Sequence, residues 1–348
     1  MKSSHKKPVL WGKRVLAVFR RRKVERVLLA PAGEGLEAYD TVLRRGLSRE
    51  SRSNMTPIEK AGTLRPADTA CLEWIYQAVI AAEANEWEDV TMLLERVIRE
   101  GEHGAVHATA GCLLLGRLYL EAVTIRAESR MNSAREEESH CRELAEGMRG
   151  EYSSSGWSAP INFMVSTALG VLDYYADNVG TAKIHMSNAE SLYEQAREQG
   201  VPGQRTHIGF VHFVQGQIRL CESEAGSAVA YLRLASSELE DDMRRQVYAF
   251  LAAAELENGN PEGARRAAMA GLSSVRGRVA RDAIVDDCEC SLAAALIRLG
   301  DRNRAKDLLE NVTKYGVDQS KQQWARETLS KLEAASKSGG VMPSNGRG

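Results

Sequence analysis

The spacing of apolar residues from about Asp68 to Ala335 predicts one amphipathic helix after another. Apolar positions recur every three or four residues, which is the spacing of a buried helical face. No alternating apolar and polar run competes with this pattern, and no proline lies between Pro66 and Pro160. Because proline kinks or ends helices, its absence favours long ones. We therefore expect an all-α protein.

Polar turn signals divide this helical stretch into pairs of helices. Residues such as Gly, Asn, Asp and Pro favour turns through their backbone conformations and local hydrogen bonds. Each signal is expected to mark the corner of a helical hairpin. The signals are Asn85-Glu86, Asp177-Asn178, Glu222-Ser223-Glu224, Asn258-Gly259-Asn260-Pro261 and Gly300-Asp301.

Small residues recur in register on the two helices of each expected hairpin. They let the helices approach closely, whereas bulky residues there would cost packing. Successive second-helix alanines lie 46, 36 and 41 residues apart, and further copies of the frame at Val90 and Ala134 indicate about six hairpins. The small positions are Ala182, Ala228, Ala264 and Ala305 in second helices, and Gly116, Gly170, Gly216, Ala252 and Ala293 in first helices.

This pattern resembles the tetratricopeptide repeat family over roughly residues 70–320. Leu115-Gly116 with Tyr119, and Leu169-Gly170, match the Leu-Gly pair of the family. Ala264, Gly271-Leu272 and Gly300-Asp301 with Ala305 match its second-helix and turn positions. The intervals are longer than the family period of 34 residues, and the proline after the second helix is mostly absent. The longer helices look more like tetratricopeptide-like sensor domains of bacterial regulators.

The resemblance implies a right-handed superhelical solenoid of about six helix-turn-helix repeats with a C-terminal capping helix. We assign it to residues 67–335, preceded by a basic amphipathic arm (1–30) and an irregular linker (31–66) in which Leu36–Leu47 is a candidate short helix. The last helix, Ser320–Ala335, is half polar, with Trp324 and Leu332 for one apolar stripe. A solenoid needs such a cap. Residues 336–348 are expected to be disordered.

The basic arm concentrates the positive charge of a nearly neutral chain. Residues 1–30 hold ten Lys or Arg and one acid, a net +9, whereas the whole chain sums to −1. We expect the arm to dock on a protein or on an anionic surface such as membrane or nucleic acid, or else back on the acidic body. Its main cations are Lys13, Arg14, Arg20, Arg21, Arg22 and Lys23, interleaved with Leu10, Trp11, Val15, Val18 and Phe19.

The N-terminal sequence is a poor secretory signal, so we expect a cytoplasmic protein. Lys13 and Arg14 interrupt the first apolar run, which argues against a secretory signal, and no apolar run is long enough to span a membrane. The acid-poor start leaves an organellar transit peptide as the alternative. The six scattered cysteines show no CxxC spacing and indicate thiols in a reducing compartment.

Catalytic, metal and cofactor motifs are missing from the sequence, so we expect a protein that is not an enzyme and uses no cofactor or metal. His103 and His107 are four apart, but Gly101 and Gly104 indicate a turn there rather than a metal site. The carboxylates Asp286, Asp287 and Glu289 are interpreted as favourable charge at the N-terminus of their own helix.

The expected function is a protein-interaction scaffold that binds a peptide or helix in its concave groove. First helices line the inner surface of such a stack, and aromatic side chains are frequent anchors of interfaces. A ligand-sensing regulatory domain and a peripheral membrane or nucleic-acid protein led by the arm are the alternatives. With long helices, the same aromatic residues could instead pack on the next hairpin. The groove residues are Thr167, Val171, Tyr174, Tyr175, Phe210, Phe213 and Gln217.

Overall fold

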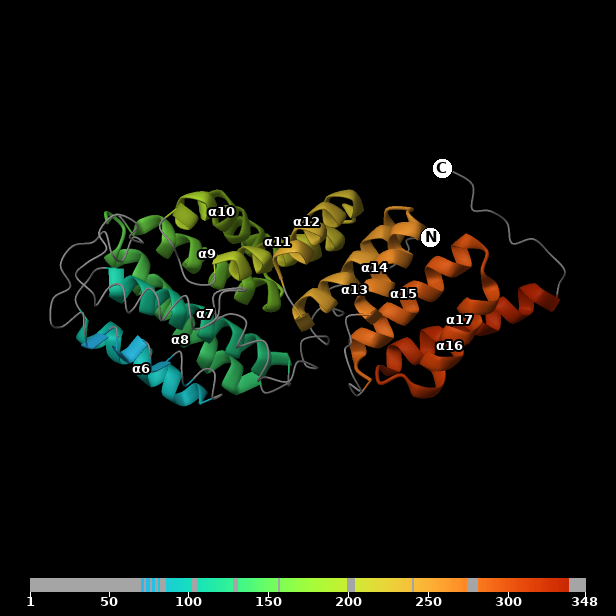
Figure 1. The fold of residues 1–348 in the computed structure, drawn as a ribbon, viewed down its shortest axis with the longest axis horizontal. Coiled ribbons are helices and arrows are strands. Elements are labelled where there is room, and N and C mark those ends of the chain that lie inside the picture. The colour runs from blue at the N-terminus through green and yellow to red at the C-terminus, as the bar shows by residue number, and fades with distance from the viewer. Residues whose placement is uncertain are drawn as a thin grey trace, which may run out of the picture. The chain divides into compact units, whose positions relative to one another are not determined.

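The computed structural model confirms an all-α chain (Figure 1). It describes parts of 70–81 and residues 86–101, 105–127, 131–155, 157–198, 204–239, 241–273 and 281–337. No strand occurs within these ranges. The basic arm, the linker and residues 338–348 lie outside them. The last helix runs to Lys337, slightly beyond the predicted start of the tail at Ser336.

Two compact units divide the chain, and the boundary falls at α12. The first unit ends at Cys221, with 237–240 added, and holds α6 (Trp87–Glu100), α7 (Ala105–Ala127), α8 (Met131–Glu151), α9 (Ser158–Tyr175), α10 (Val179–Glu198) and α11 (Gln204–Cys221). The second begins with α12 (Ala225–Glu238) and holds α13 (Asp241–Glu257), α14 (Pro261–Ser273), α15 (Ala283–Leu299), α16 (Arg302–Tyr315) and α17 (Gln319–Lys337).

Consecutive helices pack against one another within each unit (Figure 1). In the first unit, α7 packs on α8, α9 on α10 and α10 on α11, while α9 also contacts α7 and α11. In the second unit, contacts run from α13 to α17 in chain order, and α13 also contacts α15. Helices that alternate in this way form the stacked hairpins of an α-solenoid.

One hairpin turn recurs in both units. Asp177, Ser223, Gly259 and Gly300 have φ of 69°, 63°, 75° and 87°, the left-handed conformation that ends many helices. Each stands five residues before one of the predicted second-helix alanines. In each hairpin the alanine N–H donates to the carbonyl of the residue just after the left-handed one, at 2.9–3.2 Å. The turn signals at these four corners are therefore confirmed.

The predicted small positions lie where the helices pack most closely. Ala182, Ala228, Ala264 and Ala305 are all fully buried. A Cβ added at Gly170 would lie 2.8 Å from Met186 Cε of the partner helix. Gly116 differs from this expectation, because Gly111 is the glycine of α7 that faces α8: a Cβ added at Gly111 would lie 2.1 Å from Met148 Cε.

The last helix covers the apolar face of α15 and α16, as expected of a cap. Ala325 and Leu332 of α17 pack into a cluster with Cys290, Leu309 and Val312. Trp324 was expected to share this stripe, but it is 36% exposed because it lies one position off the buried row. In the part of the chain that the structure describes, no helix is long and apolar enough to cross a membrane.

Candidate functional site

The seven predicted groove residues lie in the interior of the first unit. All are at most 6% exposed. Tyr174 of α9 donates a hydrogen bond from its hydroxyl to Gln217 Oε1 of α11 at 3.1 Å, and the rings of Tyr174 and Tyr175 meet edge to face. The Tyr174–Gln217 hydrogen bond joins neighbouring first helices, as expected if the aromatic side chains pack on the next hairpin. In this structure they do not line an open surface.

A contact between α7 and α11 shows how the inner side is filled. The Tyr119 hydroxyl lies 3.1 Å from Nδ1 of His207, and the Tyr119 ring meets the Phe210 ring edge to face. Gly116 permits this approach, since a Cβ there would lie 3.0 Å from Cε1 of His207. One whole hairpin, α9 with α10, separates these two helices in sequence. The predicted anchor Phe210 is therefore packed against the protein itself.

The Tyr119–His207 pair is electrically neutral. His207 is 1% exposed and Tyr119 is fully buried. Burial lowers the pKa of His207 to about 3 and raises the pKa of Tyr119 well above its usual value. His207 also lies in the first turns of α11, where the helix dipole disfavours a cation. At neutral pH the imidazole therefore stays uncharged.

Buried carboxylates form hydrogen bonds between successive hairpins in both units. Asp173, near the end of α9, accepts a hydrogen bond from Arg142 of α8 at 2.6 Å and lies 3.6 Å from His185 Nε2 of α10. Glu255, near the end of α13, accepts from Arg233 of α12 at 2.6 Å. The two carboxylates occupy corresponding positions, three residues after Gly170 and Ala252. Each holds the preceding second helix against its own hairpin.

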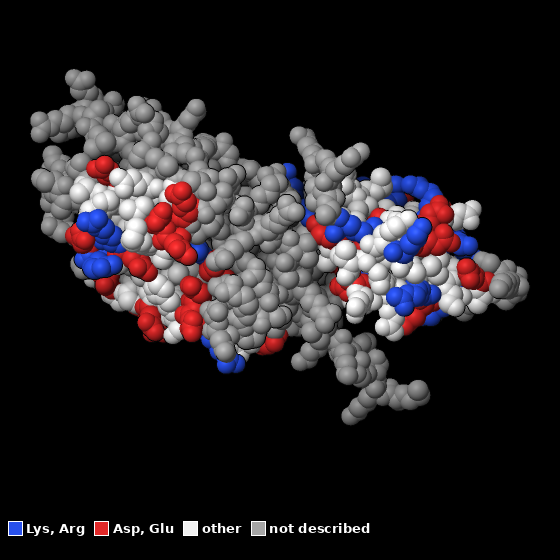
Figure 2. Space-filling model, turned by 90° about the horizontal axis from the view of Figure 1, so that it is seen from below, with Lys and Arg blue, Asp and Glu red and all other residues white. Residues whose placement is uncertain are grey.

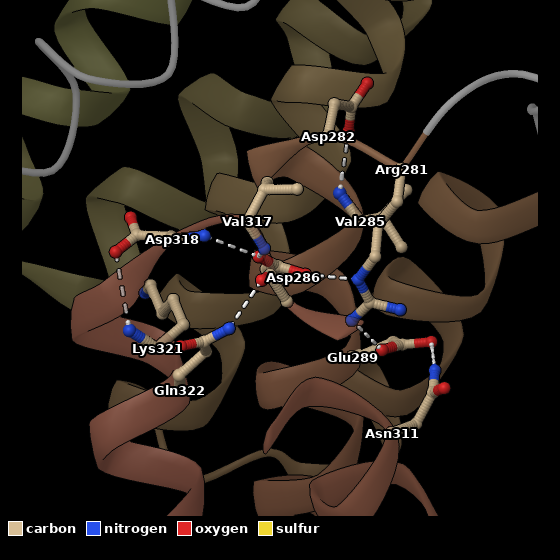
Figure 3. Close-up of polar contacts among 11 residues, drawn as sticks. Arg281, Asp282, Val285, Asp286, Glu289, Asn311, Val317, Asp318, Lys321 and Gln322 are labelled. Carbon is tan, nitrogen blue, oxygen red and sulfur yellow. Dashed lines mark hydrogen bonds and ion pairs between the residues drawn. The ribbon is translucent and has the colours of Figure 1, made fainter. Parts of the chain in front are cut away.

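Asp286 of α15 holds the α16–α17 turn (Figure 3). Its buried Oδ2 accepts hydrogen bonds from the backbone N–H of Val317 at 2.7 Å and of Asp318 at 2.9 Å, while Oδ1 accepts from Arg281 Nε at 2.7 Å. The N-terminus of α15 is instead capped by Asp282, which accepts from Val285 N–H. Asp286 lies in the first turn of α15, as predicted, but the backbone N–H groups that donate to it belong to the turn just before α17.

Asp287 and Lys321 form a buried ion pair between α15 and α17. Lys321 Nζ lies 2.8 Å from Asp287 Oδ1, and both side chains are about 95% covered. Burial raises the pKa of Asp287 to about 6, although the nearby ammonium acts in the opposite direction. Such a pair contributes little net stability, but it fixes which groups face each other. It therefore sets the position of α17 along α15.

The other candidate groups also have structural partners. His107 was expected in a turn, but it lies within α7 and is buried, with its ring nitrogens 2.8 Å from the Tyr152 hydroxyl and 3.0 Å from the Ile98 carbonyl. His103 lies outside the described residues. No group of three potential metal ligands occurs among the side chains that the structure places. Burial raises the pKa of the Cys112, Cys141 and Cys290 thiols to about 12.

The first unit exposes an acidic outer surface. Figure 2 shows more acidic than basic side chains on the visible face of this unit. Helix α8 exposes Glu136, Glu143 and Glu146, and α6 exposes Glu88 and Asp89. The basic-arm residues Lys13 to Lys23 lie outside the described ranges, so their docking on any surface stays a prediction.

The chain matches no protein-family model, no curated protein and no solved structure. The resemblance to tetratricopeptide repeats therefore rests only on the sequence positions that carry it.

Proposed function

We propose that this chain is a non-enzymatic protein-interaction scaffold built as a right-handed solenoid of about six hairpins. The recurring turn supports it, since a left-handed residue precedes a fully buried alanine by five positions at four successive corners. Stacked hairpins of this kind offer an extended surface, and proteins use such surfaces to hold partners.

We infer a partner surface on the second helices. First helices such as α9 are buried on nearly every side, whereas the second helices α8 and α10 expose one full face. Exposed charges steer association and select partners of opposite charge. In the first unit the outer face is acidic, so the partner that it favours is a basic peptide or helix.

Capture from native lysate, with nuclease added, tests this proposal. The bait is the full chain, compared with Glu136→Lys/Glu143→Lys/Glu146→Lys on α8 and with the matched set Asp307→Lys/Glu310→Lys/Glu327→Lys on α16 and α17. All six positions are exposed, so the helical circular dichroism should not change. We expect one enriched basic protein that the α8 variant loses and the control variant keeps. Equal capture by all three baits would contradict the surface, and no enriched protein would contradict the scaffold.

A further inference from the structure

The contact between α7 and α11 differs from the packing of helices within one hairpin. It joins helices separated by a complete hairpin, and it depends on one imidazole seated against a glycine. The pairs α7–α8 and α9–α10 pack along their lengths independently of it. Releasing His207 therefore leaves these hairpins intact while it uncovers Tyr119 and Phe210.

Among the described groups beside His207, the contacts are with uncharged ones. They include the Tyr119 hydroxyl and Gly116 of α7, with the Met164 methyl group of α9 next to Gly116. The Cys141 thiol of α8 lies beyond Tyr119 and is itself neutral. Among the described side chains, burial alone accounts for the low pKa of His207. A protonated imidazole can thus gain solvation only by leaving the contact.

The second histidine of α11 lies beside two carboxylates. His212 Nδ1 lies 2.6 Å from Glu238 Oε2, and Nε2 lies 3.9 Å from Glu190 Oε1 of α10. His212 therefore attaches α11 to its neighbours through contacts that are separate from the Tyr119–His207 contact.

We propose that Tyr119 and His207 form an acid-released latch, which holds α11 on α7 while the imidazole is neutral and frees the start of α11 when the imidazole is protonated. The release uncovers an aromatic surface of α7 and α11 that includes Tyr119 and Phe210. This surface is distinct from the acidic outer face of α8, so the latch does not depend on the proposed scaffold surface.

Hydrogen–deuterium exchange of the full chain, read by mass spectrometry and corrected for intrinsic rates, measures this release. Given a pKa of about 3 in the closed state and about 6.5 in the open state, opening of residues 204–216 should increase about thirtyfold from pH 7.5 to pH 5. His207→Gln, which cannot gain a charge, should abolish that increase. His140→Gln should preserve it, because the His140 side chain is 43% exposed and lies beside Glu95, away from this contact.

Two results would overturn the latch. One is wild-type exchange at α11 that does not change between the two pH values, and the other is an equal increase in His207→Gln. If His207→Gln does not fold, the imidazole of the wild-type chain is titrated by NMR instead. Titration near pH 6.5 with unchanged Tyr119 and Phe210 signals would show that protonation does not release the contact. None of these measurements needs a partner, so a failure of the latch can be distinguished from a failure of the proposed scaffold.

Discussion

Single residues at the hairpin corners adopt a left-handed backbone conformation, which the other residues of each helix do not need. Gly300 ends α15 with φ 87° and ψ 0°, and a Cβ at this position would meet no other atom within 4 Å. The cost of a side chain there is therefore one of backbone conformation alone. Gly147 on the exposed face of α8 has equally open surroundings, but its conformation is helical.

This contrast predicts opposite effects for the same substitution. Gly300→Ala should lower the free energy of unfolding by about 1 kcal/mol, because alanine disfavours the left-handed region. Gly147→Ala should raise it by about 0.5–1 kcal/mol through better helix propensity. Urea unfolding followed by circular dichroism measures both. Equal destabilisation by the two variants would contradict the assigned conformation of Gly300.

Asp287 predicts an unusual pH dependence of stability. Its pKa is about 6 in the folded chain and 3.8 when exposed, so between these values the folded state binds more protons than the unfolded state. Stability from this group therefore increases as pH falls from about 6 to 4, by up to about 3 kcal/mol. In Asp287→Asn the increase should be absent from unfolding curves recorded across this range.

The exposed carboxylate Glu310 provides the control for that experiment. It lies 3.6 Å from Lys306 on the surface of α16, where ion pairs contribute little. Glu310→Gln should follow the wild-type pH profile. If Asp287→Asn also follows the wild-type profile, the buried environment assigned to Asp287 is wrong.

At the scale of helices, packing depends on the small residue that opens each second helix. Ala228→Leu should destabilise the chain by about 1–3 kcal/mol, because the added carbons enter a fully buried position. Ala230→Leu in the same helix points to solvent and should change stability by less than about 0.5 kcal/mol. Thermal unfolding of the two variants measures the difference. Similar melting temperatures would contradict the predicted register of α12.

The spacing of apolar residues and the turn signals predicted the helices and the hairpin turns, because both depend on residues that are near in sequence. The left-handed positions fall at the turn signals, and the second-helix alanines are buried as expected. Contacts between distant helices could not be predicted in this way. His207 meets Tyr119, which lies 88 residues away, and Asp286 meets the turn that begins α17. Helical periodicity indicates which face is buried, but not which helix covers it.

At the scale of the whole molecule, sequence patterns could not distinguish the predicted groove from a filled interior. Tyr174 and Phe213 are aromatic, regularly spaced and on first helices, and these features are the same for an open groove and for a filled interior. The structure buries both. Binding is therefore expected to involve the surface of the second helices, where side chains such as Glu143 and Glu146 reach solvent.

The most direct test of this account is the affinity of the captured partner for the full chain, measured by isothermal titration calorimetry. The charge-reversed α8 variant should bind at least about tenfold more weakly than the wild type, whereas the matched variant of α16 and α17 should bind equally well. All three proteins should unfold at similar urea concentrations. The same Kd for the α8 variant and the wild type would contradict binding through the outer face of the solenoid.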